Sequence, residues 1–294
     1  MGAVFLVKTF ALIGAAGYIA PRHMKAIRDI GGRLVAACDP HDAVGVLDSY
    51  FPDCEFFTEE LPFLEFLKDN HPDYVSVCTP NSRHYYHICM GLGIPANVIC
   101  EKPPLLRPYL FKEVANLERI CERKVHTILQ LHLHPAVLEL KRNVTEHSKV
   151  RIRYVTPRGR WYHSSWKGYE NASGGIMMNI GVHLFDIALW LYGKLLETEV
   201  RELDETHAEG RLRLEHADVE WFLSIDRKHM SDERKANRLI EVDGKHLADM
   251  TGGFEELHTE VYRRIVEKGE FGIECAFDAI KLVNDLKTQW KASR

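Results

Sequence analysis

The sequence lacks the features that mark membrane, secreted and nucleic-acid-binding proteins. No run of apolar residues approaches the about 18 that a membrane-spanning helix needs. The apolar start, Met1–Gly14, has no basic segment ahead of it and leads into a glycine turn, so we expect no signal peptide. The net charge is −4 and like charges do not cluster, which disfavours nucleic acid as a partner. We therefore expect no membrane contact.

Paired cysteines and several common catalytic motifs are also missing. The seven cysteines are odd in number and scattered, and no C-x-x-C occurs. This pattern predicts free thiols in a reducing cytoplasm. The motifs G-x-S-x-G and H-E-x-x-H are absent as well, so the sequence offers no starting point for an α/β-hydrolase or a zinc protease.

The first half of the chain alternates short β-branched segments with segments of helical periodicity. This alternation is typical of a parallel sheet covered by helices, and it predicts a doubly wound α/β domain of the Rossmann type. The length of 294 residues exceeds the about 100–200 of one ordinary domain, so we divide the chain into 1–125 and 126–294. The predicted strands are Phe10–Gly14, Arg33–Asp39, Tyr74–Thr79, Val98–Glu101 and Val125–Leu129, and the predicted helices are Pro21–Ile30, Pro62–Asn70, Ser82–Leu92 and Pro108–Glu122.

In the second half strand-like segments follow one another and alternate apolar with charged residues. Such alternation leaves one face of a sheet buried and one wet, which favours an open-faced, mainly antiparallel sheet in an α+β domain. The predicted strands are Val150–Val155, Glu199–Leu203, Thr206–Leu214 and Glu220–Ile225, with helices at Asn179–Leu191, Phe254–Lys268 and Ala276–Trp290.

The first strand ends in Gly14-Ala-Ala-Gly-Tyr-Ile-Ala20 ahead of a helix. In this position a glycine turn and a helix N-terminus receive a dinucleotide pyrophosphate. Asp39 closes the next strand about 20 residues on, where a carboxylate binds the adenosine ribose and repels a 2′-phosphate. This order of strand, glycine turn, helix, strand and aspartate predicts NAD binding, although Ala16 replaces the usual second glycine. The alternative is a tight turn followed by a strand cap. The predicted contacts are Gly14, Ala16, Gly17, Tyr18, Ile19 and Asp39.

Two further strands end in polar residues at the same predicted edge of the sheet. Thr79, Pro80, Asn81 and His84 follow the third strand, and Glu101-Lys102-Pro103 follow the fourth. We assign Thr79, Pro80, Asn81, His84 and Lys102 to the nicotinamide side of the cofactor site. Glu101 and Gln130 are further predicted cofactor contacts. Lys102 is a candidate for proton relay or for donating a hydrogen bond to an alcohol. A helix cap after Pro80 and a surface turn at Lys102 are the alternatives.

The motif Glu101-Lys102-Pro103 after such a domain resembles the signature of the Gfo/Idh/MocA oxidoreductase family. The segment Ser173-Gly-Gly-Ile-Met-Met-Asn-Ile-Gly-Val-His183 is similar to that family's glycine pair and histidine-bearing helix. The resemblance covers residues about 8 to 285 and implies a Rossmann domain, an open-faced sheet and a homo-oligomer, dimer or tetramer. The family commonly has Asp where this chain has Asn179.

Within the family, the segments around Gly14, Leu131 and Asn179 resemble a bacterial branch that acts on UDP-N-acetylglucosaminuronic acid. The resemblance implies NAD-dependent oxidation of the sugar 3-hydroxyl for surface-polysaccharide (O-antigen) synthesis, with 2-oxoglutarate as a possible hydride acceptor. It implies His183 as the base and Lys102 as its partner; which of the two is the base stays open. Oxidation of another sugar or polyol, and an inactive NAD-binding regulatory protein, are the alternatives.

A UDP-sugar acid needs cationic and hydrogen-bonding groups, and the segment Arg158–Lys167 supplies both. The predicted substrate contacts are Lys102, Arg160, Tyr162, Ser164, Asn179 and His183. A surface loop with arginines over aromatic rings is the alternative for the segment. The pairs His132/His134, read as one face of a strand, and His84/His87, on a helix, lack further ligands nearby, so we expect no metal.

Overall fold

The computed structural model describes residues 7–144, 147–230, 237–254 and 256–294. The chain forms two compact units. The first contains the described residues of Met1–Leu105, Tyr109–Ile128 and His258–Cys275, and the second those of Leu106–Pro108, Leu129–Leu257 and Ala276–Arg294. Residues 1–6, which begin the apolar start of the chain, and residue 255, inside the predicted helix Phe254–Lys268, lie outside the described residues.

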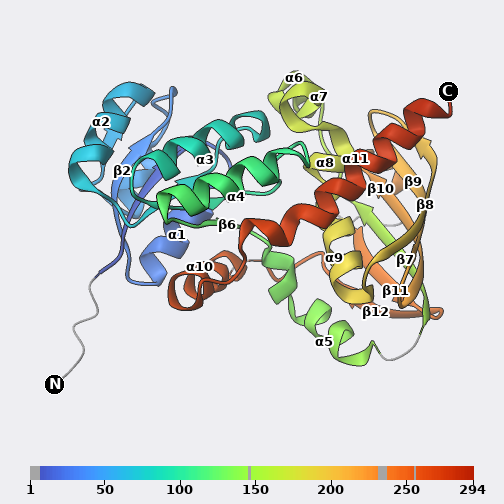
Figure 1. The fold of residues 1–294 in the computed structure, drawn as a ribbon. Helices are drawn as coiled ribbons and strands as arrows, with labels where there is room; N and C mark the ends of the chain where they lie inside the picture. The colour runs from blue at the N-terminus through green and yellow to red at the C-terminus, as the bar shows by residue number, and fades with distance from the viewer. Residues whose placement is uncertain (1–6, 145–146, 231–236, 255) are drawn as a thin grey trace. The chain divides into compact units, whose positions relative to one another are not determined.

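A six-stranded parallel sheet forms the centre of the first unit (Figure 1). Its order is β3-β2-β1-β4-β5-β6, so the direction of strand addition reverses between β1 and β4. Its strands are β1 (Thr9–Ile13), β2 (Arg33–Cys38), β3 (Glu55–Phe57), β4 (Tyr74–Val77), β5 (Asn97–Cys100) and β6 (Val125–Thr127). The predicted Rossmann architecture is confirmed. Only β3 escaped prediction, because three partly exposed residues give no readable period.

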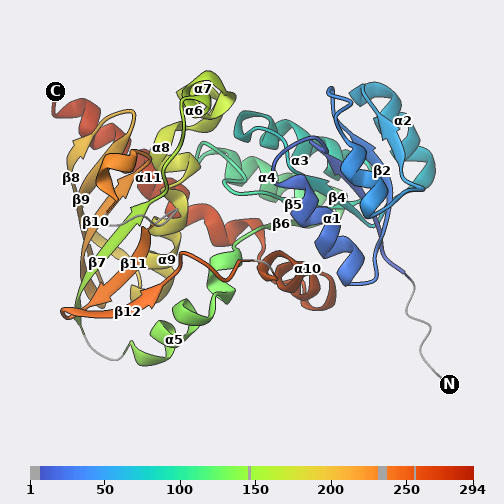
Figure 2. The same ribbon diagram turned by 180° about the vertical axis from the view of Figure 1, so that it is seen from behind.

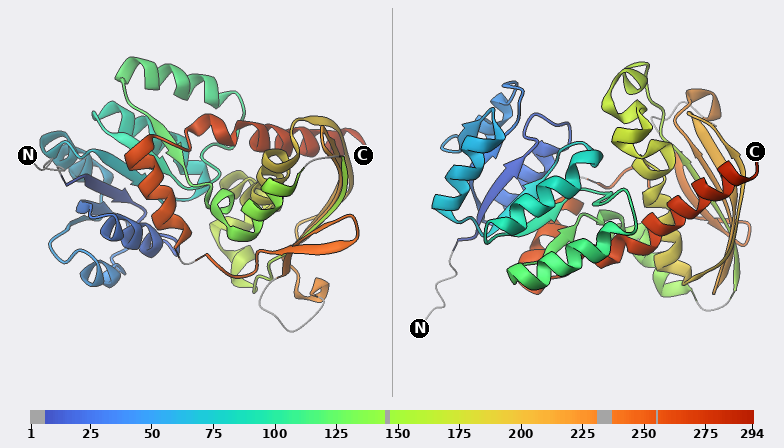
Figure 3. Two further views of the ribbon diagram at one scale, coloured as in Figure 1. Left: turned by 90° about the horizontal axis from the view of Figure 1, so that it is seen from below. Right: turned by 45° about the horizontal axis from the view of Figure 1, so that its top comes forward.

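The helices of this unit cover both faces of the sheet. Right-handed crossovers place helices on opposite faces when strands are added in opposite directions. Accordingly α3 and α4 lie on one face, and α1 lies on the other beside α10 (Figure 3). The helices are α1 (Ala20–Asp29), α2 (Glu60–Asn70), α3 (His84–Gly93), α4 (Leu110–Cys121) and α10 (Leu257–Lys268).

The segment after α10 returns to the sheet edge. The Thr127 amide donates to the Phe271 carbonyl over 2.8 Å, and His126 forms an antiparallel bridge with Gly272. Tyr262 on α10 is fully buried beneath β1 and stacks at a tilt against Phe10, with 6.0 Å between the ring centres. A segment from the end of the chain therefore completes the core of the first unit.

The second unit contains a six-stranded mixed sheet, ordered β12-β11-β7-β10-β9-β8 (Figure 2). All neighbours are antiparallel except β7 and β10, which run parallel. The strands are β7 (Ser148–Val155), β8 (Leu195–Leu203), β9 (His207–Leu214), β10 (Ala217–Ser224), β11 (Asn237–Val242) and β12 (Lys245–Asp249). The prediction of a mainly antiparallel sheet is confirmed, with β11 and β12 added to the expected strands.

One face of this sheet is covered by α9 (Val182–Tyr192) and α11 (Phe277–Ala292) (Figures 1 and 2). Phe185 on α9 meets the fully buried Trp221 of β10 edge-to-face, with 5.1 Å between ring centres. The opposite face carries cross-strand ion pairs such as Arg211–Glu220 and Arg151–Glu241. This is the alternation of apolar and charged residues that the sequence shows.

Two local predictions in this unit are wrong. His132 and His134 do not lie on a strand, because Gln130–Leu133 forms a 3-10 helix and His134 then caps α5 (Pro135–Asn143). The expected helix Asn179–Leu191 is broken at Ile180 and Gly181 between α8 (Gly175–Asn179) and α9. The short helices α6 (Trp161–Ser164) and α7 (Glu170–Ser173) precede α8.

Among the described helices, none alone is long and apolar enough to span a membrane. The bent pair Glu170–Asn179 and Val182–Tyr192 passes that test together, on length and composition only.

Candidate functional site

The turn after β1 is shaped by Gly14. Its φ of +92° is one that L-residues avoid, and a Cβ there would lie 2.7 Å from the carbonyl carbon of Cys78. The turn therefore lies directly against the end of β4. This is the point where the strand order reverses, and open α/β sheets bind their ligands there.

Asp39, at the end of β2, holds this turn in place. Its Oδ2 accepts a hydrogen bond from the Ala16 amide over 3.0 Å, and its Oδ1 accepts one from the His41 amide over 2.9 Å. The structure thus brings together two predicted cofactor residues, Ala16 and Asp39. Tyr18 is 84% exposed, and Ile19 precedes the first turn of α1. The glycine turn, the helix start and the carboxylate fit an NAD phosphate and ribose.

The segment after β4 is fixed by His84, the first residue of α3. This fully buried imidazole has Nε2 2.8 Å from the Thr79 carbonyl oxygen and Nδ1 2.8 Å from the Pro103 carbonyl oxygen. Burial lowers the pKa of His84, and the two hydrogen bonds act in the opposite direction. His84 therefore joins the two segments that carry the predicted nicotinamide contacts, and Asn81 lies buried between them in sequence. Pro80 is half-buried.

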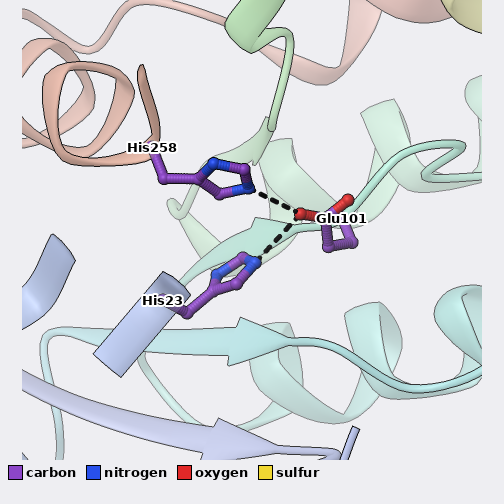
Figure 4. A group of neighbouring side chains, drawn as sticks. All are labelled: His23, Glu101 and His258. Atoms are coloured by element: carbon purple, nitrogen blue, oxygen red, sulfur yellow. Dashed lines mark hydrogen bonds and ion pairs between the residues drawn. The ribbon is translucent and has the colours of Figure 1, made fainter. Parts of the chain in front are cut away.

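Lys102 follows β5 and is half-buried. Its main-chain amide donates to Oε2 of Glu101 over 3.1 Å. Glu101 is buried, and its other oxygen, Oε1, accepts hydrogen bonds from His23 Nε2 over 3.0 Å and from His258 Nε2 over 3.2 Å (Figure 4). Burial opposes ionisation of Glu101, but the bonds from His23 and His258 outweigh it and hold the pKa of the carboxyl well below its usual range.

Sequence reasoning assigned no role to His23, His258 or their neighbours. His23 Nδ1 lies 2.7 Å from the Tyr262 hydroxyl, which lies 2.7 Å from the Ser76 hydroxyl. The one sequence feature that pointed to this buried group was His23, a polar residue on the apolar stripe of α1. No sequence pattern connects it to α10, about 240 positions away in the chain, because the contact exists only after folding.

The second unit carries the predicted substrate residues. The Asn179 amide nitrogen donates to the Tyr162 hydroxyl over 2.9 Å, so two of these residues are joined. Burial raises the pKa of Tyr162, with the bond from Asn179 acting against it. Arg160 and Ser164 are exposed on either side of Tyr162, and His183 is half-buried in the first turn of α9.

Two other polar residues of this unit bear on the site. Asp186, one turn after His183, accepts a hydrogen bond from His132 Nε2 over 2.9 Å, and His132 stacks on Trp190 with 4.4 Å between ring centres. Gln130 is buried, and its Oε1 has no hydrogen-bond partner within the described part of the chain. Lys102 and most predicted cofactor residues thus belong to the first unit, and Gln130 and the other predicted substrate residues to the second.

Comparison with known proteins places both halves of the chain in one family. Residues 8–129 match the domain described as "Oxidoreductase family, NAD-binding Rossmann fold", and residues 144–225 match the "GFO/IDH/MocA C-terminal domain".

Two solved structures of the WlbA (WbpB) dehydrogenase from Thermus thermophilus are similar over nearly the whole chain. One holds NAD and UDP-GlcNAcA; it is 43% identical, covers 94% of both chains and has a TM-score of 0.91. The other holds NAD and alpha-ketoglutarate; it is also 43% identical, covers 96% of this chain and 95% of that one, and has a TM-score of 0.93.

A curated relative is more distant. The D-glucoside 3-dehydrogenase of Escherichia coli (strain K12) is 29% identical over 170 residues, which is 54% of this chain and 46% of that enzyme. The chain matches about half of the length of the curated relatives.

Proposed function

Because the chain belongs to the Gfo/Idh/MocA oxidoreductase family, we propose that it oxidises the 3-hydroxyl of UDP-N-acetylglucosaminuronic acid to a ketone. It is an NAD-dependent oxidoreductase with an NAD-binding Rossmann domain. The proposal for the substrate is carried by one observation: a structure that holds NAD and UDP-GlcNAcA is 43% identical over 94% of the chain.

The first unit would hold NAD through the turn at Gly14 and through Asp39. A Cβ at Gly14 would fill the space against Cys78, so the glycine keeps the main chain close to where a pyrophosphate would lie. The Asp39 carboxylate would accept hydrogen bonds from ribose hydroxyls. When bound there, NAD supplies an acceptor for the hydride that leaves the sugar carbon.

The proton that leaves the sugar hydroxyl needs an acceptor on the protein. We assign this role to His183, since an imidazole can take a proton near neutral pH. Lys102 would donate a hydrogen bond to the same oxygen, which favours the developing carbonyl. The carbon loses a hydride and the oxygen loses a proton, so the step is a balanced two-electron oxidation.

Residues of the second unit would bind the anionic parts of the substrate. The Arg160 guanidinium suits bidentate binding of a carboxylate or pyrophosphate. Tyr162 and Ser164 would donate hydrogen bonds, and Asn179 would hold the Tyr162 hydroxyl in place. Gln130, with its buried acceptor oxygen, is kept as a cofactor contact.

A non-nucleotide sugar is the second candidate substrate, because the chain is also related to a D-glucoside 3-dehydrogenase. The test mixes the purified protein and NAD with UDP-N-acetylglucosaminuronate, with UDP-N-acetylglucosamine, or with free glucosides and inositol. NADH absorbance and product mass are followed, with and without 2-oxoglutarate. A ketone formed from the uronate alone supports the proposal. Turnover of glucosides or inositol alone would establish the second candidate, and NAD binding without any turnover would favour a regulatory protein.

We also propose a cytoplasmic homo-oligomer, a dimer or tetramer, that acts in surface-polysaccharide synthesis and uses 2-oxoglutarate to reoxidise NADH. Support comes from free cysteines and from a related structure that holds NAD with alpha-ketoglutarate. Sedimentation velocity tests the assembly, and a single species at monomer mass would contradict it. Formation of 2-hydroxyglutarate in step with sugar oxidation tests the acceptor.

A further inference from the structure

The buried group formed by His23, Glu101 and His258 joins three elements of the first unit (Figure 4). His23 comes from α1, Glu101 from the end of β5 and His258 from α10. The exposed fractions of the three residues are 0%, 6% and 1%, so water does not share these contacts. A polar group this deeply buried is destabilising unless its hydrogen bonds are satisfied.

The hydrogen bonds fix where the protons lie. An ionised carboxylate only accepts, so both His23 and His258 must carry hydrogen on Nε2. His23 Nδ1 lies 2.7 Å from the Tyr262 hydroxyl, which lies 2.7 Å from the Ser76 hydroxyl, so the chain of hydrogen bonds continues to β4. His258 Nδ1 has no partner among the described residues, which suits a bare nitrogen and not a buried N–H. The group therefore contains one carboxylate and, at His258, a neutral imidazole.

Burial of His258 favours this arrangement. Desolvation lowers the pKa of its imidazole, and the bond to Glu101 acts in the opposite direction. Outside this group of three residues, the positive charge of Arg22 also lowers the pKa of His258.

We propose that His23 and His258 are positioning residues, which hold the Glu101 carboxylate so that its free oxygen fixes the main chain at Lys102. Glu101 Oε1 is occupied by the two imidazoles, and Oε2 accepts the Lys102 amide over 3.1 Å. The inference rests on the proposed function, in which Lys102 contacts the reacting oxygen. The inference adds that the contact of Lys102 with the reacting oxygen depends on α1 and α10. These helices carry His23 and His258, which bond to one oxygen of Glu101 while the Lys102 amide bonds to the other.

Each histidine therefore affects catalysis through geometry. Loss of one donor leaves a buried carboxylate with fewer hydrogen bonds, and the carboxylate must shift toward the remaining donors. The Lys102 amide is bonded to the same carboxylate and would shift with it. A displacement of about 1 Å of a catalytic group costs about 100-fold in turnover.

A divalent cation is the rival occupant of the same atoms. One ligand atom from each of His23, Glu101 and His258 lies within 4.8 Å of the others. A metal would bind bare Nε2 atoms, so both imidazoles would carry hydrogen on Nδ1. The two readings thus predict opposite tautomers. The unpartnered Nδ1 of His258 favours the hydrogen-bonded arrangement, since a metal-bound imidazole needs an acceptor for its Nδ1–H.

The first experiment is nitrogen-15 NMR of histidine-labelled full-length protein, with His23 and His258 assigned through His23→Gln and His258→Gln. We expect both imidazoles to carry hydrogen on Nε2, and metal analysis to find no equimolar zinc. Hydrogen on Nδ1 of both rings together with equimolar zinc would overturn the proposal. This readout requires no substrate, so it stands even if the proposed reaction is wrong.

The second experiment compares His258→Leu with His258→Gln. The glutamine amide nitrogen replaces Nε2–H, whereas leucine fills the space without a donor. On whichever substrate the wild type oxidises, we expect His258→Leu to lower kcat by about 100-fold with KM for the sugar and Kd for NAD nearly unchanged. His258→Gln should recover most of the kcat. Wild-type kcat in a folded His258→Leu would overturn the proposal.

Two further variants guard against a folding defect. Tyr262→Phe removes only the hydroxyl that is hydrogen-bonded to His23, so we expect a folded protein with kcat lowered several-fold. His126→Leu is the matched control, since His126 is also buried in the first unit but bonds to the Glu270 carbonyl. An equal fall of kcat in His126→Leu would show that loss of any buried histidine has this effect and would contradict the proposal.

Discussion

The side-chain amide of Asn179 donates a hydrogen bond to the hydroxyl oxygen of Tyr162 over 2.9 Å. Both residues are buried, and they come from α8 and α6. Because the tyrosine oxygen accepts this bond, its own hydrogen can point to another acceptor. The Tyr162 hydroxyl can thus act as a donor, a role that an aspartate at position 179 would not support because a carboxylate only accepts.

A double-mutant cycle on this pair tests the contact. We expect Asn179→Leu and Tyr162→Phe each to raise KM for the sugar nucleotide, and to show a coupling free energy of about 1 kcal/mol in binding. The measurement is substrate affinity by titration calorimetry for the wild type, both single variants and the double variant. Strictly additive effects would mean that the bond does not orient Tyr162 for substrate.

Replacement of Lys102 or His183 by alanine should abolish turnover. The proposed roles lie in proton transfer and in hydrogen bonding to the reacting oxygen, which contribute about 100- to 10,000-fold. We expect NAD to bind nearly as well as in the wild type, because the glycine turn and Asp39 are untouched. Steady-state kinetics and NAD fluorescence titration measure the two effects. Parallel loss of NAD affinity would mean that these residues hold the cofactor instead.

The glycine turn can be tested with a matched pair of substitutions. Gly14 and Gly31 both have positive φ, but a Cβ at Gly14 would meet the main chain of Cys78 whereas Gly31 has nothing within 4 Å. We expect Gly31→Ala to lower the free energy of unfolding by about 1–2 kcal/mol. Gly14→Ala should cost more and should also abolish NAD binding. Equal effects in urea denaturation would show that the turn can move away from β4.

Cofactor choice should depend on the charge of Asp39. Asp39→Asn keeps an oxygen that can accept from the Ala16 amide but removes the negative charge that repels a 2′-phosphate. We expect the ratio of NAD to NADP affinity to fall by about 10-fold, since hydrogen bonds to charged groups contribute about 1.5–3 kcal/mol. Competition binding of the two cofactors measures the ratio. An unchanged ratio would remove Asp39 from the ribose site.

Stability should fall in mild acid. Desolvation lowers the pKa of His87, His126 and His258 in the folded protein, so the unfolded chain binds more protons below the ordinary histidine pKa of about 6.5. Stability is therefore present above that pH and is lost as pH falls below it, by up to about 1.4 kcal/mol per pH unit for each such histidine.

The lowered pKa of Glu101 extends the loss of stability to more acidic pH. As the pH falls, this carboxyl takes up a proton in the unfolded chain before it does so in the folded protein, and protonation therefore favours unfolding. Urea denaturation between about pH 7.5 and about pH 4.5, a range that spans the ordinary pKa values of histidine and glutamate, measures the slope of the free energy of unfolding against pH. The variant His126→Gln should make this slope smaller. A free energy of unfolding that does not change over this range would contradict the prediction.

Local periodicity carried most of the fold prediction. Strands β1, β2, β4, β5 and β6 were foreseen because buried parallel strands are short, β-branched and bounded by turn residues. The segment Gln130–Leu133 was misread because alternating histidine and leucine has a strand period, whereas in the structure it forms a 3-10 helix ahead of His134, which caps α5. The break at Gly181 was missed; a Cβ there would meet both the main chain of Met177 and the Leu223 side chain of β10.

By itself the sequence determined most of the elements, the glycine turn, the position of Asp39 at the end of β2, and the lysine at the end of β5, because each depends on residues that are near in the chain or at a set spacing. Only the tertiary structure decided which distant residues surround Glu101. His23 and His258 lie on helices at opposite ends of the chain, and their bonds to one carboxylate arise when α1 and α10 pack on the same face of the sheet. No local pattern encodes such a contact, since it forms only when segments from both ends of the chain pack together.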